Sequence, residues 1–377
     1  MNERILLSLA HMGGTERKYV EEAFNSNWIV PLGPNVDEFE KRLEQFLGHG
    51  HVVALSAGTA AIHLGLVMLG VGKGDEVICQ SFTFSASANP VRYCGAEPVF
   101  VDSEAETWNM DPVLLEQAIL DRKKVTGRYP KAIIPVYLYG MPAKIDKILE
   151  IADKYGIPVL EDAAEGLGSD YDGRKCGTFG RYGALSFNGN KIITTSGGGA
   201  LICPDAESAA RVKFYATQAR ENRPYYYHEV IGYNYRLSNV SAGIGCGQME
   251  VLEDHLARRR EIHNLYEAGL AGVPGIHVHN NPSPRYNSNF WLTTIILDPE
   301  VAGITPDELR LALEAENIES RLRWRPMHMQ PVYRNNPYYG NGVSEQLFNT
   351  GLCLPSGSSL NDIQIERVIN VIKNSVR

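Results

Sequence analysis

A lysine and a carboxylate stand in an order that suggests shared chemistry. Lys191 follows the segment from Ser186 to Asn190, and Asp162 comes shortly after an apolar run that begins at Ile157. A lysine amine can hold an aldehyde cofactor as a Schiff base, and a carboxylate can keep a pyridine nitrogen protonated so that the ring accepts electrons. This pair of residues therefore predicts a pyridoxal-phosphate site.

The surroundings of both residues favour this interpretation over a surface location. Most lysines in proteins are solvated, but Lys191 lies between small or amide residues and the uncharged run from Ile192 to Thr195. The apolar run before Asp162 follows a tyrosine-glycine turn signal and is typical of a buried strand. The carboxyl ends of strands face the ligand crevice in open α/β sheets, so we expect Asp162 to face a ligand.

Two further segments could complete such a site. Gly58 and Thr59 stand where an expected strand, 52–55, runs into an expected helix, 59–69. A helix N-terminus with a hydroxyl residue is a natural phosphate site, although an ordinary helix cap explains the same residues. Phe84 follows the next expected strand, 76–78, and could stack on a pyridine ring, although core packing is the default for phenylalanine.

Composition limits the classes of function. The chain has 377 residues, of which 44% are hydrophobic and 21% are charged, and a formal net charge of -8. These values are typical of a globular protein and disfavour a general affinity for nucleic acid or an anionic membrane. The six scattered cysteines suggest free thiols, and the apolar stretch Ile5 to Ala10 is too short for a signal peptide or a membrane span. We expect a cytoplasmic protein.

Histidine pairs and glycine turns carry weaker signals. His49 and His51, like His277 and His279, have the spacing of metal ligands, but no third ligand is suggested nearby, so we expect no metal. The glycines from Gly70 to Gly74 lack the full nicotinamide-binding pattern after a strand.

The order of expected elements indicates an α/β protein. Apolar strand patterns alternate with helical patterns from about residue 50 to 205, which implies a mostly parallel central sheet covered by helices. A long charged helix follows over about 248–268, and we place a domain boundary there. We expect a large cofactor-binding domain with the N-terminal segment, 1–248, and a smaller C-terminal α+β domain, 249–377. The latter has an expected strand at 291–297, a helix at 306–317 and a closing helix after Asp362.

Six motifs, taken together, resemble the DegT/DnrJ/EryC1 family of sugar aminotransferases. They appear in family order between residues 56 and 240 and read Ser-Ala-Gly-Thr-Ala-Ala, Ser-Phe-Thr-Phe, Glu-Asp-Ala-Ala-Glu, Ser-Phe-Asn-Gly-Asn-Lys, Thr-Ser-Gly-Gly-Gly and Gly-Tyr-Asn-Tyr-Arg-Leu-Ser-Asn. The resemblance implies the type I aspartate aminotransferase fold, pyridoxal 5'-phosphate as cofactor, and a homodimer with active sites at the subunit interface.

The resemblance also implies roles for individual residues. Lys191 would form the Schiff base, Asp162 would pair with the pyridine nitrogen, and Phe84 would stack on the ring. The phosphate cradle would comprise Gly58, Thr59 and Ser186, with Asn234 reaching the phosphate from the other subunit. Glu165 stands where many relatives have histidine or glutamine, near the phenolic oxygen of the cofactor. A carboxylate would repel a phenolate there unless one of them holds a proton.

Two further segments, 216–222 and 323–328, resemble enzymes that aminate C4 of a UDP-linked 2-acetamido-4-keto-2,4,6-trideoxyhexose. L-glutamate would donate the amino group in the first half of a ping-pong reaction. An acidic protein must bind the pyrophosphate with local arginines. The candidate substrate-binding residues are Arg220, Arg321, Arg323, Arg325 and His328, and any single arginine could equally be a solvated surface residue.

Other functions stay open at this point. A GDP- or dTDP-linked 4-keto sugar could replace the UDP sugar. A deoxysugar dehydratase of the same fold would have histidine in place of Lys191, which argues against that activity. A cofactor-binding regulatory protein without turnover is disfavoured by the intact pair of Lys191 and Asp162.

Overall fold

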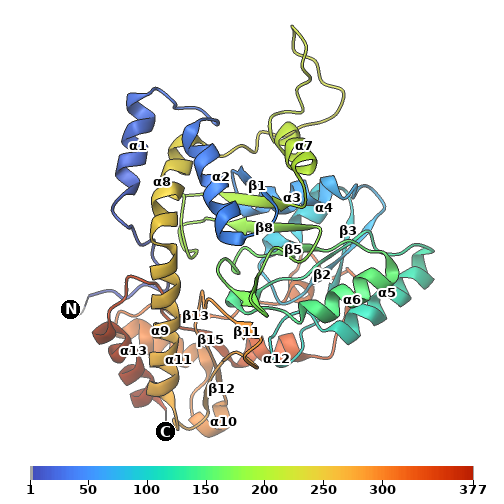
Figure 1. Cartoon of the computed structure of the whole chain (residues 1–377). Coiled ribbons are helices and arrows are strands. Elements are labelled where there is room, and N and C mark those ends of the chain that lie inside the picture. The colour runs from blue at the N-terminus through green and yellow to red at the C-terminus, as the bar shows by residue number, and fades with distance from the viewer. Residues whose placement is uncertain (1–2, 377) are drawn as a thin grey trace.

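The computed structural model describes residues 3–376, and its centre is a twisted sheet (Figure 1). One half of the sheet has the strand order β1-β9-β8-β5 and the other has β14-β3-β2-β4. Parallel bridges between Ile133 and Val159 and between Val136 and Asp162 join β4 to β5. Among the described strands of this sheet only β9 runs antiparallel to its neighbours. The predicted α/β class with a mostly parallel sheet is confirmed. The strands are β1 (His51–Leu55), β2 (Glu76–Gln80), β3 (Glu97–Val101), β4 (Ala132–Ile134), β5 (Leu160–Asp162), β8 (Tyr182–Ser186), β9 (Gly199–Cys203) and β14 (Tyr338–Tyr339).

Helices cover both faces of this sheet. Alternate residues of a strand point to opposite faces; in β1, Val52 and Ala54 join one core cluster and Val53 and Leu55 join the other. The first cluster is covered by α2, α5, α6 and α8, and the second by α3, α4 and α7. The strands are therefore buried on both sides, which explains their continuous apolar sequences. The helices are α2 (Pro34–Leu47), α3 (Gly58–Met68), α4 (Asn89–Tyr93), α5 (Pro112–Thr126), α6 (Ile145–Tyr155), α7 (Ala206–Ala216) and α8 (Asn239–Glu250).

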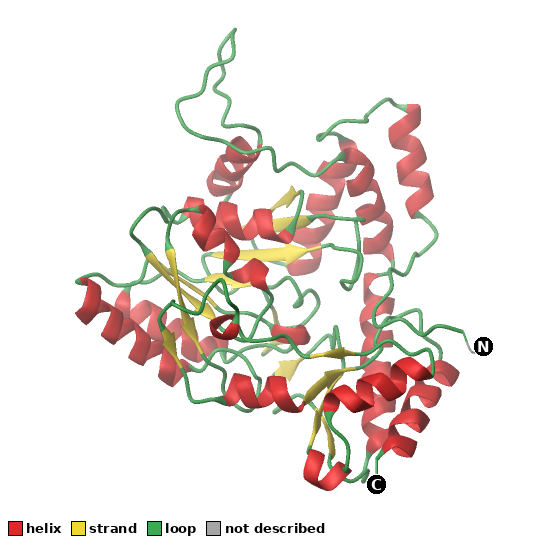
Figure 2. Cartoon of the chain, turned by 180° about the vertical axis from the view of Figure 1, so that it is seen from behind, coloured by secondary structure: helices red, strands yellow, loops and turns green. Residues whose placement is uncertain are grey.

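A smaller antiparallel sheet with the order β10-β12-β15-β13 lies beside the large one (Figure 2). Its helices α9, α11 and α13 share a third apolar cluster with its strands. Ile5 belongs to this cluster and pairs with Ile318, so the N-terminal segment packs on the C-terminal part of the chain. The elements are β10 (Ile276–Val278), β12 (Thr294–Leu297), β13 (Arg321–Leu322), β15 (Gly351–Cys353), α9 (Leu252–Leu270), α11 (Pro306–Ala315) and α13 (Asp362–Ser375).

The structure refines the predicted elements near the domain boundary. The charged helix is divided at Val251 into α8 and α9, and Leu252 and Leu256 pack in the core of the large sheet. The expected strand at 291–297 begins only at Thr294. This difference arises because the amide of Trp291 donates to the Asn289 side chain and that of Thr293 donates to Ser356 Oγ. The boundary at residue 248 stays a prediction.

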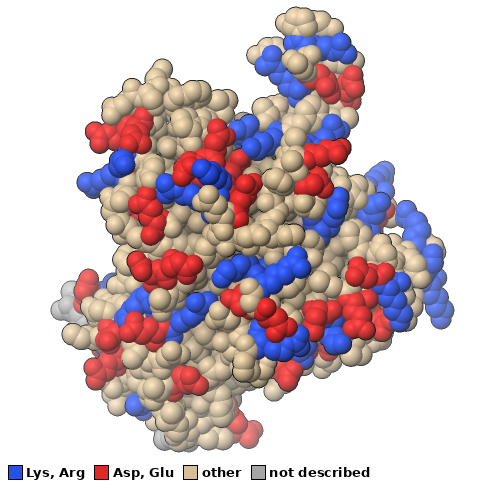
Figure 3. Space-filling view, in the orientation of Figure 1, with Lys and Arg blue, Asp and Glu red and all other residues tan. Residues whose placement is uncertain are grey.

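The remaining elements are short or peripheral. A long irregular arm, residues 217–238, connects α7 to α8 and extends away from the body (Figures 1 and 2). Acidic and basic side chains are interspersed over the face shown in Figure 3. No helix within residues 3–376 is long and apolar enough to cross a membrane. The peripheral elements are α1 (Glu16–Asn25), β6 (Asp170–Tyr171), β7 (Arg174–Lys175), β11 (Tyr286–Asn287), α10 (Pro299–Ala302), α12 (Val343–Thr350) and the 3₁₀ turns η1 (Ser85–Ser87), η2 (Leu138–Gly140) and η3 (Met327–Met329).

Candidate active site

Two neighbouring strands bring the lysine and the carboxylate to one cavity. β5 and β8 are parallel, and Asp162 at the end of β5 pairs in register with Ala184. The chain leaves β8 after Ser186 and turns back, so that the amide of Lys191 donates to the carbonyl of Asn188. Asp162 and Lys191 both line a cavity of about 350 Å³. The placement agrees with the expectation that polar residues at strand carboxyl ends meet at one rim of the sheet.

Asp162 is a buried carboxylate whose two oxygens are held in place. Oδ2 accepts a hydrogen bond from Ser87 Oγ at 2.5 Å, and Oδ1 accepts one from the amide of Ala164 at 3.1 Å. Burial raises the pKa of Asp162 despite these bonds and the nearby Lys191. A cation in the cavity would offset that cost, because an opposite charge favours the ionised carboxylate. A protonated pyridine nitrogen fits this requirement.

Glu165 lies against the lysine on the same cavity wall. Its Oε1 stands 3.3 Å from Lys191 Nζ, and its Oε2 accepts a hydrogen bond from the amide of Tyr139 at 2.7 Å. Burial raises the pKa of Glu165. A carboxyl group that is easier to protonate can donate to a phenolate instead of repelling it, so Glu165 is compatible with a cofactor oxygen at this wall.

The start of α3 forms a cradle suited to a phosphate. Gly58, Thr59, Ser186 and Gly198 all line the cavity. No side chain caps the first turn of α3 in the described part of the chain, so its backbone N–H groups are available to an anion. A Cβ added at Gly58 would stand 3.0 Å from the Cβ of Ser186, which shows how closely the two walls approach. The residues present therefore fit the phosphate of pyridoxal phosphate.

Phe84 stands at the mouth of the cavity and is half exposed. Its ring meets that of Trp324 edge to face, with centroids 4.7 Å apart. An exposed aromatic face beside Asp162 and Lys191 is suited to stacking on a flat heterocycle.

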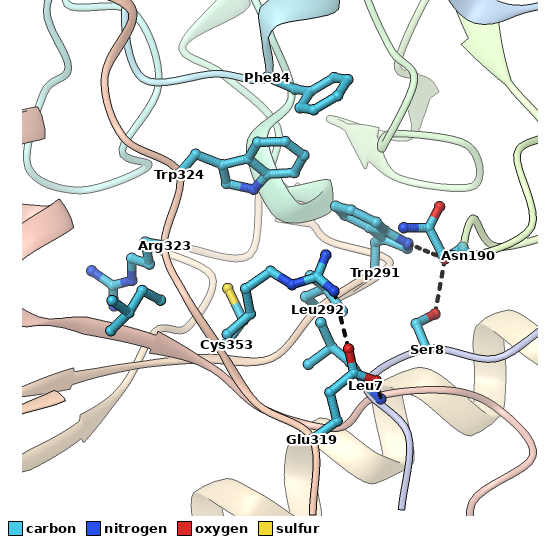
Figure 4. A pocket seen from close by; sticks show the side chains of 12 residues that line it. Leu7, Ser8, Phe84, Asn190, Trp291, Leu292, Glu319, Arg323, Trp324 and Cys353 are labelled. Atoms are coloured by element: carbon cyan, nitrogen blue, oxygen red, sulfur yellow. Dashed lines mark hydrogen bonds and ion pairs between the residues drawn. The ribbon is translucent and has the colours of Figure 1, made fainter. Parts of the chain in front are cut away.

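A second cavity of about 340 Å³ adjoins the first (Figure 4). The two cavities share four lining residues, Phe84, Asn190, Arg321 and Trp324. Figure 4 shows the rings of Phe84, Trp324 and Trp291 along one side and Glu319 on the other. A molecule larger than the cofactor can therefore reach from Lys191 into an aromatic-walled recess. Sequence reasoning did not identify Trp291 or Glu319, since no motif in the sequence marks them, and it gave no role to Trp324, although Trp324 lies in the segment 323–328.

The predicted substrate-binding arginines lie in different surroundings. Arg321 lines both cavities, and its Nη2 donates to Glu319 Oε1 at 3.0 Å. Arg220 lies on the arm, where its guanidinium stacks 4.5 Å from the ring centroid of Tyr226. Asn234 is exposed and forms a backbone bridge with Thr217. Neither Arg220 nor Asn234 lines the two cavities of its own chain.

The other three candidates already bond to protein groups or are exposed. Arg323 lines the second cavity, but it is buried, donates to the carbonyls of Leu347 and Ile295, and stacks on Trp108. Burial lowers its pKa to about 10. Since its terminal nitrogens already bond to backbone carbonyls, we remove Arg323 from the proposed substrate contacts. The Arg325 side chain is exposed.

His328 lies outside both cavities. Its Nδ1 is 2.7 Å from Ser81 Oγ, and its Nε2 is 3.2 Å from Glu345 Oε1. Its ring also stacks on Tyr338, with centroids 3.6 Å apart. Both ring nitrogens therefore already have protein partners, which supports a packing role.

The sheet order, the covering helices and the lysine-carboxylate cavity define a pyridoxal-phosphate enzyme of the aminotransferase type. Residues 10–373 match the model of the DegT/DnrJ/EryC1/StrS aminotransferase family. The chain belongs to this family, whose members are sugar aminotransferases that use pyridoxal phosphate. The predicted fold, cofactor and enzyme class are confirmed. Within residues 3–376 no three His, Cys, Asp or Glu side chains are grouped as metal ligands.

Individual relatives cover almost the whole chain. EpsN of Bacillus subtilis (strain 168), provisionally assigned as a pyridoxal phosphate-dependent aminotransferase, is 48% identical over 99% of this chain and 96% of its own. GDP-perosamine synthase of Caulobacter vibrioides is 38% identical over 97% of this chain and 96% of its own. A DegT DnrJ EryC1 StrS aminotransferase from Brucella abortus is similar in structure, with a TM-score of 0.89, 34% identity, and coverage of 96% of this chain and 95% of the other.

Proposed function

We propose that the protein transfers the amino group of L-glutamate to C4 of a nucleotide-linked 4-keto-6-deoxy sugar. The first candidate substrate is a UDP-linked 2-acetamido-4-keto-2,4,6-trideoxyhexose, and the product would be a UDP-4-amino sugar for surface glycan or glycoprotein synthesis. The observation that carries the proposal is the shared wall of the two cavities. It places Lys191 next to a recess that can hold a sugar.

The residues of the chain have distinct tasks in this reaction. Bound pyridoxal phosphate supplies the electron sink for amino transfer. Asp162 keeps the pyridine nitrogen protonated, and the start of α3 with Ser186 holds the phosphate. The amine of Lys191 would remove the proton from the substrate carbon and hold it for redelivery, and it would act in the opposite direction at C4 of the sugar. Phe84 would stack on the ring plane, and Trp324 packs edge to face against Phe84.

The nucleotide is the least constrained part of the substrate. Segments 216–222 and 323–328 resemble enzymes that use UDP sugars, whereas the name of the Caulobacter relative refers to a GDP sugar. Arg321 is the arginine with access to both cavities and is our candidate contact for an anionic group of either substrate. Arg325 is a weaker candidate because it lies outside both cavities.

We further propose that the active form is a cytoplasmic homodimer. The arm carries exposed apolar side chains, with Tyr226 79% and Ile231 82% exposed, and the segment from Trp28 to Leu32 is also apolar and exposed. A second copy of the chain would cover these surfaces and could bring Asn234 and Arg220 to the neighbouring cavity. Free cysteines throughout the described chain support a reducing compartment. Sedimentation of the purified protein tests the dimer, and a monomer at micromolar concentration would contradict it.

Two measurements test the proposed function. L-glutamate added to the cofactor-loaded protein should convert the absorbance of the lysine-bound cofactor to that of the amine form. A binding protein without turnover would leave the spectrum unchanged. Incubation with a panel of UDP-, GDP- and dTDP-linked 4-keto sugars, followed by NMR, should identify a 4-amino product and its stereochemistry. Rejection of every UDP sugar would overturn the first candidate substrate.

A further inference from the structure

Trp291 contacts both Lys191 and the residue that precedes it. Its ring centroid lies 3.9 Å from Lys191 Nζ, and its indole Nε1 donates to the carbonyl of Asn190 at 2.6 Å. Only 1% of Trp291 is exposed, and the rigid ring has few rotamers to choose from. One side chain therefore restrains both the amine and the backbone that carries it.

A second group holds the same carbonyl from the other side of the chain. Ser8 Oγ donates to the carbonyl of Asn190 at 2.8 Å, as Figure 4 shows beside the Trp291 contact. Arg259 on α9 in turn donates to Ser8 Oγ at 3.0 Å and to the carbonyl of Trp291 at 2.6 Å. Arg259 thus joins the N-terminal segment to the backbone of Trp291, and Ser8 and Trp291 each bond to the lysine loop.

Burial of the Arg259 guanidinium costs more free energy than a purely structural contact requires. It is fully buried, its oxygen partners are the carbonyls of Trp291 and Ser356 and the hydroxyl of Ser8, and burial lowers its pKa to about 9. A buried charge without a carboxylate costs free energy, and an apolar side chain of similar shape would often be cheaper. A charged donor does make stronger and more directional hydrogen bonds. Its presence beside the lysine loop therefore favours a role in precise placement.

The same segment also holds the other partner of the lysine. The Asn289 side chain accepts a hydrogen bond from the amide of Trp291 at 2.8 Å and donates to the carbonyls of Glu165 and Leu167, each at 2.8 Å. Glu165 Oε1 is 3.3 Å from Lys191 Nζ. Asn289 therefore fixes the positions of Trp291 and Glu165, the two residues that face the amine of Lys191, relative to each other.

We propose that Trp291 is a positioning residue for Lys191, held in place by a clamp that consists of Ser8, Asn190 and Arg259. The proposal rests on the proposed amino transfer. When the amino group of a substrate displaces Lys191 from the cofactor, the freed amine must stay beside the substrate carbon to move the proton. The indole face would hold the protonated amine near the substrate carbon, because a cation is attracted to an aromatic face. The clamp would keep the backbone at Asn190 and Lys191 in place.

Three variants separate the ring contact from the clamp. Trp291→Leu removes both the ring and the indole donor, and Trp291→Phe keeps a ring and removes the donor. Ser8→Ala removes the other donor to Asn190 together with the hydroxyl that accepts from Arg259. Leu309→Ala is the matched control, because Leu309 is buried in the cluster of the small sheet away from both cavities. All four are made in the full chain, and Ser8→Ala tests the clamp without replacing the buried Arg259.

The first readout is the single-turnover conversion of the cofactor by L-glutamate. Trp291→Leu should lower the rate constant at saturating glutamate about 10-fold, with a change below about 2-fold in the apparent Kd for glutamate. A 10-fold change corresponds to about 1.4 kcal/mol, which is within the range of a desolvated cation-π contact. Glutamate deuterated at C2 should show a larger isotope effect in this variant, because proton transfer becomes slower. The rate constant of Trp291→Phe at saturating glutamate should fall about 3-fold.

The second readout does not depend on turnover. In cofactor-free protein the amide of Lys191 is protected by its bond to the carbonyl of Asn188. Hydrogen exchange of the peptide spanning 188–192 should be faster in Trp291→Leu and Ser8→Ala and unchanged in Leu309→Ala.

Wild-type rate constants and wild-type exchange in Trp291→Leu would overturn the positioning role. If wild-type protein did not respond to glutamate while exchange still changed as expected, the proposed function would fail and the clamp would stand.

Discussion

The cofactor side and the substrate side of the site are built in different ways. Asp162 and Ser186 end two strands of one sheet, α3 begins just after the end of β1, and all three positions line one cavity. The predicted substrate arginines come from loops and short strands: Arg220 lies on the arm and Arg323 lies in the interior. The order of strands and helices predicts where residues at their ends lie. The positions of loop residues depend instead on individual hydrogen bonds. The two sides should therefore respond differently to substitution.

The largest effect should follow from Lys191→Ala. The variant loses both the attachment point of the cofactor and the proton carrier, and a positioned acid-base group alone contributes about 10²- to 10⁴-fold. We expect at least a 10³-fold loss of amino transfer, measured by formation of 2-oxoglutarate. Turnover at the wild-type rate would refute the assignment of the cofactor side.

Asp162→Asn should have the next largest effect. The amide can still accept a bond from Ser87 but cannot stabilise a protonated pyridine nitrogen by charge. Loss of one such electrostatic contact costs about 10²- to 10³-fold, and we expect a fall of about 10² in the rate constant with glutamate. Cofactor content serves as the control, because a variant that simply lost the cofactor would recover its rate when cofactor is added in excess.

Arg321→Gln should give a moderate effect confined to binding. A charged hydrogen bond contributes about 1.5 to 3 kcal/mol, or roughly 10- to 100-fold. We expect KM to rise at least 10-fold for one of the two substrates while kcat changes little. Arg334→Gln is the matched control, because its side chain is exposed outside both cavities and has no proposed substrate contact. Equal kinetics in the two variants would remove Arg321 from the substrate side.

Arg323→Met should alter stability and leave substrate binding unchanged. Its removal leaves the carbonyls of Leu347 and Ile295 without this donor in the interior. An unpaired buried polar group costs about 1 to 3 kcal/mol, so we expect the free energy of unfolding to fall by about 2 kcal/mol in urea titrations. A large rise in KM at unchanged stability would show that Arg323 contacts the substrate.

The smallest effect concerns the pH dependence of stability. Burial raises the pKa of Glu165 in the folded chain, so folding favours its protonated form. The stability contribution of that protonation is complete below the unfolded pKa and is lost as the pH rises through the folded value. The Tm of cofactor-free Glu165→Gln, relative to wild type, should therefore be higher at pH 8 than at pH 5. An offset that does not vary with pH would contradict a raised pKa.

Much of the fold and of the cofactor side was predictable because it depends on patterns. Apolar runs that end in Asp162 and Ser186 predict buried strands, and a glycine-threonine pair predicts the start of a helix. The roles of these side chains stay predictions until variants are measured. The pattern at 291–297 was less informative, since Trp291 has strand-like neighbours but bonds to the side chain of Asn289. Contacts such as Ser8 with Asn190 join residues far apart in the sequence and have no local signal.

The bridge between Ile5 and Ile318 also has a consequence for synthesis on the ribosome. Domains generally fold as units as the chain emerges, and every strand of the large sheet except β14 has been made once β9 is complete. The segment that carries Ser8 must wait for Ile318 and Ser356, because it pairs with both. The lysine loop would thus receive one of its two restraints only after nearly the entire polypeptide has left the exit tunnel. A nascent chain stalled before that point would have its large sheet but only a loosely held cofactor lysine.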